Sequence, residues 1–273
     1  MNFSYKGKIF SIEGVSDKDH IYKTMRRKNT FYEEDLLNYL HNILNKPNEV
    51  TIGVDVGANI GNHSIYFQSF VCNHLIAIEP NKSVLPILHK NLNNNITNFK
   101  IYECAVAESA GKAHIVLAEE DKDNIGMATL SFDIDEKKDT VNVSTVDAIV
   151  NNYLQETKEA TQVSFIKIDV EGMEIAVLNG STNTLDKYKP DIFAEAATKE
   201  EYLALCAYLI PRGYCKLGVW ATTPVYHFSY KPKLFTRIKA VKYAVLKKIN
   251  RIRIRINKLI KLSQSNKGIN IIK

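Results

Sequence analysis

The strongest constraint on the fold is an alternation of β-type and helix-type segments between residues 50 and 210. Each β-type segment is rich in Val, Ile and Phe, and most are followed by a stretch with apolar residues at helical spacing. The β-type segments are 50–56, 74–80, 99–106, 164–170 and 191–196, and the helix-type stretches are 61–70, 83–94, 144–154, 172–185 and 199–210. This alternation predicts an α/β fold with a doubly wound, mostly parallel sheet and helices on both faces.

Segments outside the alternation complete the expected organisation. Residues 31–44 have apolar positions near helical spacing and predict a helix that Pro47 ends. Residues 111–143 contain short strand-like pieces and predict a β insertion, whereas 214–220 and 223–228 predict an antiparallel pair at one sheet edge. The expected parts are an N-terminal β/helix extension (1–48), a main domain (49–229, β insertion about 111–143) and a basic tail (230–273).

The turn after the first β-type segment has the spacing Asp55-x-Gly57-x-Asn59-x-Gly61. Ligands of open α/β sheets bind outside the carboxyl ends of the strands, and glycines permit a close backbone approach. An acid at Asp55 would repel a pyrophosphate but would suit a cation such as the sulfonium of S-adenosylmethionine. Glu79 ends the second segment and can accept both ribose hydroxyls, as acids at this place also do in NAD sites. The combination predicts S-adenosylmethionine; NAD, or a glycine-rich connection without a ligand, are the alternatives.

Six short motifs follow one another within about residues 25–200: VDVGANIGNHSIYF, IAIEPN, ECAV, STVDAIV, FIKIDVEGMEIAVLNGS and PDIFAEA. In this order they resemble the FkbM-type S-adenosylmethionine-dependent methyltransferases. The most specific element is the stretch from Lys167 to Gly172, followed by Glu174. The resemblance implies a seven-stranded, Rossmann-like methyltransferase sheet and O-methylation, often of a sugar hydroxyl. It fades after about residue 200 and does not identify the acceptor.

The resemblance also implies cofactor-binding positions. The turn after the first strand would line the methionine side, the acid after the second strand would bind ribose, and the loop 104–106 would border adenine. Residues 31–33, Phe-Tyr-Glu, resemble the aromatic–Glu element of the family and are expected to close over the cofactor. The cofactor-binding residues expected in this way are Glu33, Asp55, Gly57, Asn59, Gly61, Glu79, Ala105 and Asp169.

Methyl transfer to a hydroxyl requires alignment of the two reactants, together with a base or a metal that helps to remove the proton. Asp169, Glu171 and Glu195 follow the fourth and fifth strands and are expected to converge. We predict Asp169 and Glu171 as the catalytic acids, with either as general base. The alternative is Mg²⁺ held by Asp169 and Glu195. Glu174 is expected to cap the following helix, and Lys167 to pair with a carboxylate.

Three further sites carry weaker signals in the sequence. His63 follows the glycine turn, where we expect a partly exposed polar residue, and His227 is expected in a strand near the sheet edge. Residues 126–129 of the β insertion are expected on the acceptor side, because insertions at this end of a sheet build acceptor pockets.

The charge distribution divides the chain into an acidic body and a basic tail. From Tyr202 to the end there are 16 Lys and Arg and no Asp or Glu, whereas the preceding residues hold 20 basic residues and all 30 acids. Apolar residues of segment 231–262 recur in steps of three and four, which predicts a basic amphipathic helix. The expected partner is an anionic membrane surface. RNA bound by the basic face, packing of the apolar stripe on protein, and a strand in RIRIRI (251–256) are alternatives.

The remaining sequence features concern location and activity. The sequence indicates a cytoplasmic protein, because its four cysteines form no C-x-x-C pair and it has no signal-peptide pattern and no membrane-spanning apolar run. The basic tail adds the expectation that it is peripheral on the inner face of the cytoplasmic membrane. We expect it to methylate a sugar hydroxyl of a carbohydrate or glycolipid acceptor. The alternatives are an RNA ribose methyltransferase that uses the tail, or a non-catalytic cofactor-binding module anchored to a membrane. Nucleobase N-methylation is disfavoured because no N-P-P-Y-type element is present.

Overall fold

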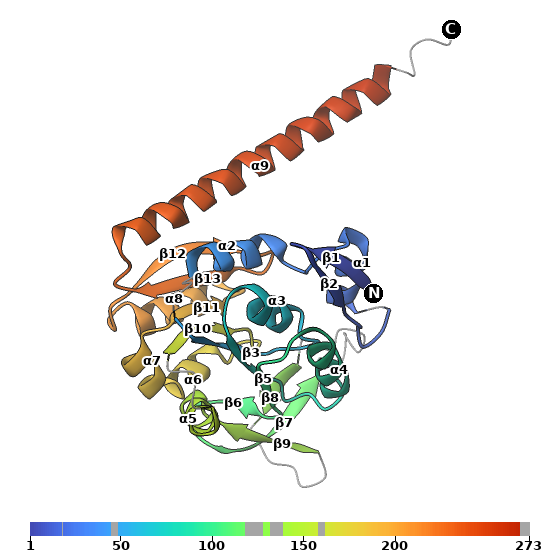
Figure 1. The fold of residues 1–273 in the computed structure, drawn as a ribbon. Helices are drawn as coiled ribbons and strands as arrows, with labels where there is room; N and C mark the ends of the chain where they lie inside the picture. The colour runs from blue at the N-terminus through green and yellow to red at the C-terminus, as the bar shows by residue number, and fades with distance from the viewer. Residues whose placement is uncertain (18, 45–48, 118–127, 132–138, 158–161, 268–273) are drawn as a thin grey trace. The chain divides into compact units, whose positions relative to one another are not determined.

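The chain divides into two compact units, Met1–Lys231 and Pro232–Lys273. The structure is a computed structural model that describes residues 1–17, 19–44, 49–117, 128–131, 139–157 and 162–267. The first unit contains the N-terminal extension, the large sheet with its helices and the β insertion (Figure 1). The second unit contains one long helix and is described by itself below.

The large sheet has seven strands, as expected. In spatial order they are β12 (Tyr214–Trp220), β13 (Val225–Tyr230), β11 (Asp191–Glu195), β10 (Gln162–Ile168), β3 (Thr51–Val56), β4 (His74–Ile78) and β5 (Phe99–Tyr102). The strands from β11 to β5 are parallel, and the antiparallel pair β12–β13 closes one edge. All six residues of β3 are buried, as is typical of a central parallel strand covered on both faces. The predicted doubly wound sheet is therefore confirmed.

Eight helices accompany this sheet in the described part of the first unit. They are α1 (His20–Lys28), α2 (Glu34–Leu44), α3 (Asn62–Phe70), α4 (Leu85–Asn95), α5 (Val146–Glu156), α6 (Glu174–Asn179), α7 (Thr182–Tyr188) and α8 (Lys199–Leu209). Side-chain caps fix several starts: Thr145 accepts from the N–H of Ala148, and Thr198 forms a capping box with Glu201. The sequence did not predict α1, because only Thr24 and Met25 in it are buried and its other side chains are mostly polar.

Three predicted segments have different boundaries in the structure. The helix expected at 31–44 begins only at Glu34, because Glu33 has a left-handed backbone with φ 54°. The strand expected at 99–106 is two strands, β5 and β6 (Ala105–Val106), which belong to different sheets. The helix expected at 172–185 is divided into α6 and α7 at Gly180, where a Cβ would lie 2.1 Å from the carbonyl oxygen of Ala107. The chain turns there because the backbone of the neighbouring segment passes against the glycine.

The β insertion is confirmed as a separate four-stranded sheet. Its strands are β6, β9 (Thr140–Ser144), β7 (Gly111–Leu117) and β8 (Ala128–Ser131), in that spatial order. Gly126 and Met127, which were expected on the acceptor side, lie outside the described residues.

The N-terminal extension is anchored by an aromatic core. It begins with a two-stranded hairpin of β1 (Asn2–Tyr5) and β2 (Lys8–Ser11). The ring of Phe31 packs edge-on against Phe3 and Phe10, with centroids 5.0 and 4.9 Å away, and all three side chains are buried. Phe31 also packs edge-on against Tyr66 of α3, with centroids 5.3 Å apart, so the segment 31–33 is held where the extension meets α3.

The second unit contains α9 (Leu234–Lys267), a single helix of 34 residues. The RIRIRI stretch is helical, so the strand alternative for it is wrong. Among the described residues, no helix combines the length and the apolarity that crossing a bilayer requires.

Candidate active site

A cavity of about 710 Å³ opens at the carboxyl ends of the central strands of the sheet. Ten residues that the sequence analysis discussed individually line it: Glu33, Gly57, Asn59, His63, Glu79, Ala105, Lys167, Asp169, Glu171 and Glu195. Asp55 and Gly61, which were expected on its methionine side, do not line it. The volume is in the range of roughly 300–1,000 Å³ that is typical of small-molecule sites.

The turn between β3 and α3 lines the cavity and has a tightly curved backbone. Gly57 has φ 83°, and a Cβ on it would lie 1.9 Å from the carbonyl oxygen of Asp169. Asn59 is also left-handed, with φ 50°. Gly61 caps α3 and is packed against α4, where a Cβ would lie 2.4 Å from Cδ1 of Leu92. Gly61 is therefore required for helix packing, which corrects its expected place on the cavity wall.

Glu79 lies at the end of β4 with its carboxylate fixed by backbone donors. The N–H groups of Asn59 and Asn81 donate to its two oxygens at 2.8 and 2.9 Å. Its side chain is buried, and burial raises the pKa of its carboxyl group. Each oxygen keeps a second lone pair that can accept a hydroxyl donor from a ligand.

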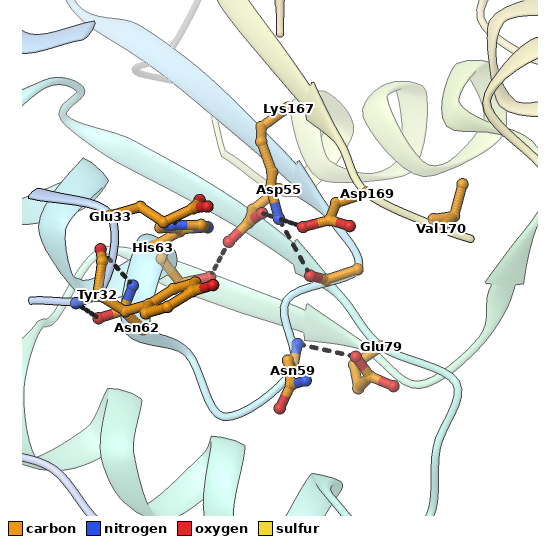
Figure 2. A network of polar contacts seen from close by, with 12 residues as sticks. Tyr32, Glu33, Asp55, Asn59, Asn62, His63, Glu79, Lys167, Asp169 and Val170 are labelled. Atoms are coloured by element: carbon orange, nitrogen blue, oxygen red, sulfur yellow. Dashed lines mark hydrogen bonds and ion pairs between the residues drawn. The ribbon is translucent and has the colours of Figure 1, made fainter. Parts of the chain in front are cut away.

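Lys167 lies between two carboxylates and also lines the cavity (Figure 2). Lys167 on β10 pairs in register with Asp55 on β3, so the two side chains are neighbours. The Nζ atom lies 3.5 Å from Oδ1 of Asp55 and 3.1 Å from Oδ2 of Asp169, and donates to the carbonyl oxygen of Gly57 at 3.4 Å. Burial lowers the pKa of Lys167, but the two carboxylates outweigh it and hold the pKa above its usual range.

Asp55 is fully buried behind the cavity wall. Ser64 on α3 donates to its Oδ2 at 2.6 Å, and its Oδ1 faces the ammonium group of Lys167 without a hydrogen bond. In the structure Asp55 lies beside Lys167 and does not line the cavity, and its contact with the cofactor stays a prediction. The sequence could not show that the strand carrying Lys167 would lie beside β3.

Asp169 and Glu195 converge as expected and share one proton. Burial, and then the Asp169 carboxylate, raise the pKa of Glu195 to about 10, so its carboxyl group donates a hydrogen bond to Asp169. Desolvation would raise the pKa of Asp169, but Lys167 and the hydrogen bond from Glu195 lower it below its usual range. Oxygens of Asp169, Glu171 and Glu195 all lie within 4.8 Å of one another.

The aromatic–Glu element is attached to α3 by a side chain that the sequence analysis did not single out. Asn62 accepts a hydrogen bond from the N–H of Tyr32 at 2.9 Å and donates one to the carbonyl oxygen of Tyr32 at 3.2 Å. Glu33 lies next in the chain, and its Oε2 is 3.3 Å from Nε2 of His63 (Figure 2). His63 is only 8% exposed and lines the cavity, so the expectation of a partly exposed histidine is wrong.

Tyr32 also lines the cavity. Burial, followed by the charges of Glu33, Asp169 and Glu195, raises the pKa of the Tyr32 hydroxyl to about 12. Its phenol therefore stays protonated at neutral pH and is available as a donor. The signal for Tyr32 in the sequence was its place beside Glu33 in the resembling element, but its orientation depends on Asn62.

The outer rim of the cavity comes from elements that sequence reasoning did not assign to the site. Helix α1 contributes two exposed basic side chains, Arg27 and Lys28, and the turn between β12 and β13 contributes Thr222 and Thr223. No sequence signal was available for these residues, because they reach the cavity only through tertiary packing.

Two other predicted residues have structural roles. Glu174 lies in the first turn of α6, where its charge favours the helix dipole, but it does not cap the helix: it accepts from the N–H groups of Val170 and Gly172, at 3.4 and 3.2 Å, in the turn that precedes α6. His227 lies in β13, next to the edge strand, and is fully buried. Its ring nitrogens contact Asp191 at 2.8 Å and the hydroxyl group of Tyr39 at 2.7 Å, and it does not line the cavity.

Comparisons with known proteins agree with this geometry. The Methyltransferase FkbM domain model matches residues 55–215, which is more than half of the chain. Methyltransferase sdnD from Sordaria araneosa is 26% identical over 174 residues, covering 55% of this chain and 67% of that protein. The crystal structure of a methyltransferase FkbM from Methylobacillus flagellatus superposes with a TM-score of 0.51 at 18% identity. The match covers 74% of this chain and 49% of that one, so it spans about half of the longer protein and shows a shared fold.

Proposed function

The chain belongs to the FkbM methyltransferase family, and on that premise we propose that it transfers a methyl group from S-adenosylmethionine to a hydroxyl oxygen of an acceptor. The observation that carries the proposal is the acid-lined cavity at the carboxyl ends of β3, β4, β10 and β11. This cavity combines a glycine turn after β3, a carboxylate at the end of β4 and a cluster of acids after β10 and β11.

The donor set fits a ligand that is cationic at one end and carries a ribose at the other. Glu79 offers a fixed carboxylate for ribose hydroxyls, and the left-handed backbone at Gly57 and Asn59 keeps the turn close to the cavity. Asp169 and Glu33 lie on the same wall, and carboxylates would stabilise a positive charge and repel a pyrophosphate. When bound, S-adenosylmethionine supplies a methyl group already activated by a cationic sulfur.

The acidic residues differ in their ability to accept a proton from the acceptor hydroxyl. Lys167 and Glu195 stabilise the ionised form of Asp169, which makes Asp169 a weak base suited to orienting a hydroxyl. Burial raises the pKa of Glu171, so Glu171 is the better proton acceptor of the two. We therefore assign the general base to Glu171 and the positioning of the acceptor to Asp169.

A metal-independent reaction is consistent with the charges at the site. A divalent cation held by Asp169 and Glu195 would have to displace the shared proton and lie beside the ammonium group of Lys167. Lys167 and the proton already offset the negative charge that would otherwise attract a metal. Activity that a chelator abolishes, and that Mg²⁺ restores, would contradict this part of the proposal.

A sugar hydroxyl in a glycan or glycolipid precursor is the proposed acceptor. Two observations support it: the wall offers several carboxylates and the Tyr32 hydroxyl as hydrogen-bond partners for a polyol, and the sequence resembles enzymes that often methylate sugars. The threonines of the β12–β13 turn add further hydroxyl groups at the rim.

Calorimetric titration tests the cofactor. We expect S-adenosylmethionine to bind and NAD to bind more weakly or not at all. Glu79→Ala should weaken S-adenosylmethionine binding by about 1.5–3 kcal/mol, the size of hydrogen bonds to a charged group. Glu103→Ala is the matched control, because Glu103 is an exposed acid that pairs with His89 and does not line the cavity. Tighter binding of NAD, or equal effects of the two substitutions, would contradict the assignment.

Transfer of a labelled methyl group, screened against nucleotide sugars, lipid-linked glycans and RNA, tests the acceptor. We expect label on a carbohydrate-containing acceptor, and Glu171→Gln should lower the rate constant more than it changes cofactor affinity. Label on RNA alone would favour ribose methylation instead. Cofactor binding without transfer to any class would favour a non-catalytic module.

A further inference from the structure

Helix α9 carries a continuous apolar stripe that is exposed to solvent. The stripe, defined here by the exposed apolar residues at steps of three and four, has side chains that are 49–73% exposed. Its members are Leu234, Ile238, Val241, Val245, Ile249, Ile252 and Ile256. Because these steps follow the helical period, all seven side chains lie on one face. Exposed apolar surface of this extent marks an interaction site.

The remainder of α9 is strongly basic. Between residues 234 and 267 there are 11 Lys and Arg and no Asp or Glu. The helix therefore has a high positive charge with no acidic side chain of its own, as is typical of helices that bind an anionic surface. At about 1.5 Å per residue its 34 residues extend over about 50 Å.

We propose that α9 lies in the plane of an anionic lipid membrane, with the stripe in the acyl boundary and the basic side chains on the headgroups. In this arrangement the apolar face of α9 is buried in the acyl boundary and the basic side chains contact anionic headgroups, so both faces contribute to binding. The helix is too rich in charge to cross the bilayer. The proposal does not depend on what the first unit methylates.

The two competing partners each leave one feature of α9 unexplained. A second copy would cover the stripe but would bring together two helices that each carry 11 basic side chains and no acidic one. RNA would neutralise the charges, but it would leave the seven stripe side chains in water. An anionic lipid surface satisfies both the apolar face and the charge.

The test is co-sedimentation of the full-length chain with vesicles. We expect binding to phosphatidylcholine vesicles that contain a quarter phosphatidylglycerol, and little binding to phosphatidylcholine alone. Raising the salt to about 1 M shortens the Debye length to about 3 Å and should weaken binding without abolishing it, because the apolar contribution remains. Equal binding to both kinds of vesicle would overturn the proposed attraction between the basic side chains and anionic headgroups.

A matched pair of variants separates the stripe from the charge. Val241→Glu/Val245→Glu places two acids on the stripe, and Thr236→Glu/Ala244→Glu places two acids on other faces of α9 with the same change in net charge. We expect the stripe variant to lower vesicle partitioning by about tenfold and the control variant by less than about threefold. Unchanged binding of S-adenosylmethionine in both would show that the first unit is intact.

Three results would overturn the proposal. Equal losses in the two variants would mean that the stripe does not enter the membrane. A dimer seen by light scattering without vesicles, and lost only in the stripe variant, would assign the stripe to a second copy. Binding of RNA that is tighter than vesicle binding and insensitive to the stripe variant would assign α9 to nucleic acid.

Discussion

At the residue scale, the site depends on where a few charges are placed. Lys167 forms ion pairs with Asp55, behind the cavity wall, and with Asp169, which lines the cavity. The raised pKa of Glu195 keeps its carboxyl group protonated beside the ionised Asp169. The sequence predicted that Asp169, Glu171 and Glu195 would meet, because strand ends of a parallel sheet share one edge. The sequence also predicted Asp55 on the cavity wall, where the structure does not place it. Asp55 lies behind the wall because β3 and β10 are neighbours in the sheet, which pairs Asp55 with Lys167.

The raised pKa of Glu195 predicts a pH-dependent stability. The folded chain holds this proton up to a pKa of about 10, whereas the unfolded chain loses it above its ordinary value of 4.5. The free energy of unfolding should therefore fall as pH rises through this window. Glu195→Gln removes the titration and keeps a donor to Asp169. Between about pH 6 and pH 9 the variant should lose less stability than the native chain, by on the order of 1 kcal/mol after allowing for partial solvent exposure.

Denaturant unfolding at both pH values measures this difference. Glu200→Gln, at the exposed start of α8, is the control. It should lose as much stability between the two pH values as the native chain does. A native chain whose stability rises over this pH range more than that of Glu195→Gln would show that Glu195 is ionised in the folded state.

At the element scale, the cavity is completed by an attachment between segments that are 30 residues apart. The two hydrogen bonds of Asn62 hold the backbone of Tyr32 against the start of α3. The sequence predicted the helices and most strands of the sheet, since their apolar periods are clear. It could not predict α1, the separation of β5 from β6 or the break at Gly180, because each follows from packing against a distant segment.

Loss of the Asn62 attachment should loosen the cavity wall. Asn62→Ala leaves the N–H and carbonyl groups of Tyr32 without these partners, at an expected cost of about 1–3 kcal/mol in the free energy of unfolding. Affinity for S-adenosylmethionine should fall as well, because Glu33 and Tyr32 would no longer be held on the wall. Chemical denaturation and calorimetry measure the two effects. Asn94→Ala, an exposed asparagine of α4, should change neither; a drop of equal size there would remove the role assigned to Asn62.

At the scale of the whole molecule, the two units have different compositions and different predicted tasks. The first unit contains the sheet, the cavity and all 30 acids, and the second contains a basic helix without any acid. The sequence indicates this division, because no acid follows residue 201 and a basic segment with apolar residues at helical spacing begins after residue 230. The identity of the acceptor could not be predicted from the sequence, because the rim that would select it is built from α1 and from the β12–β13 turn.

A chain that ends at Lys231 should therefore keep its cofactor site. We expect its affinity for S-adenosylmethionine to stay within about twofold of the full-length value, because no residue of α9 lines the described cavity. Its binding to anionic vesicles should be lost. Calorimetry and co-sedimentation on the same preparation measure both, and a truncated chain that binds vesicles as well as the full-length chain would place the membrane contact in the first unit.

The left-handed backbone at Glu33 and Glu171 has a consequence for engineering and for natural variation. Both residues line the cavity, and a non-glycine residue in this conformation costs roughly 1–2 kcal/mol. Glycine would relieve that strain but would delete a carboxylate from the wall. Selection for heat resistance and selection for turnover should thus pull these two positions in opposite directions, so a thermostable variant obtained without an activity screen would be expected to lose its acids there first.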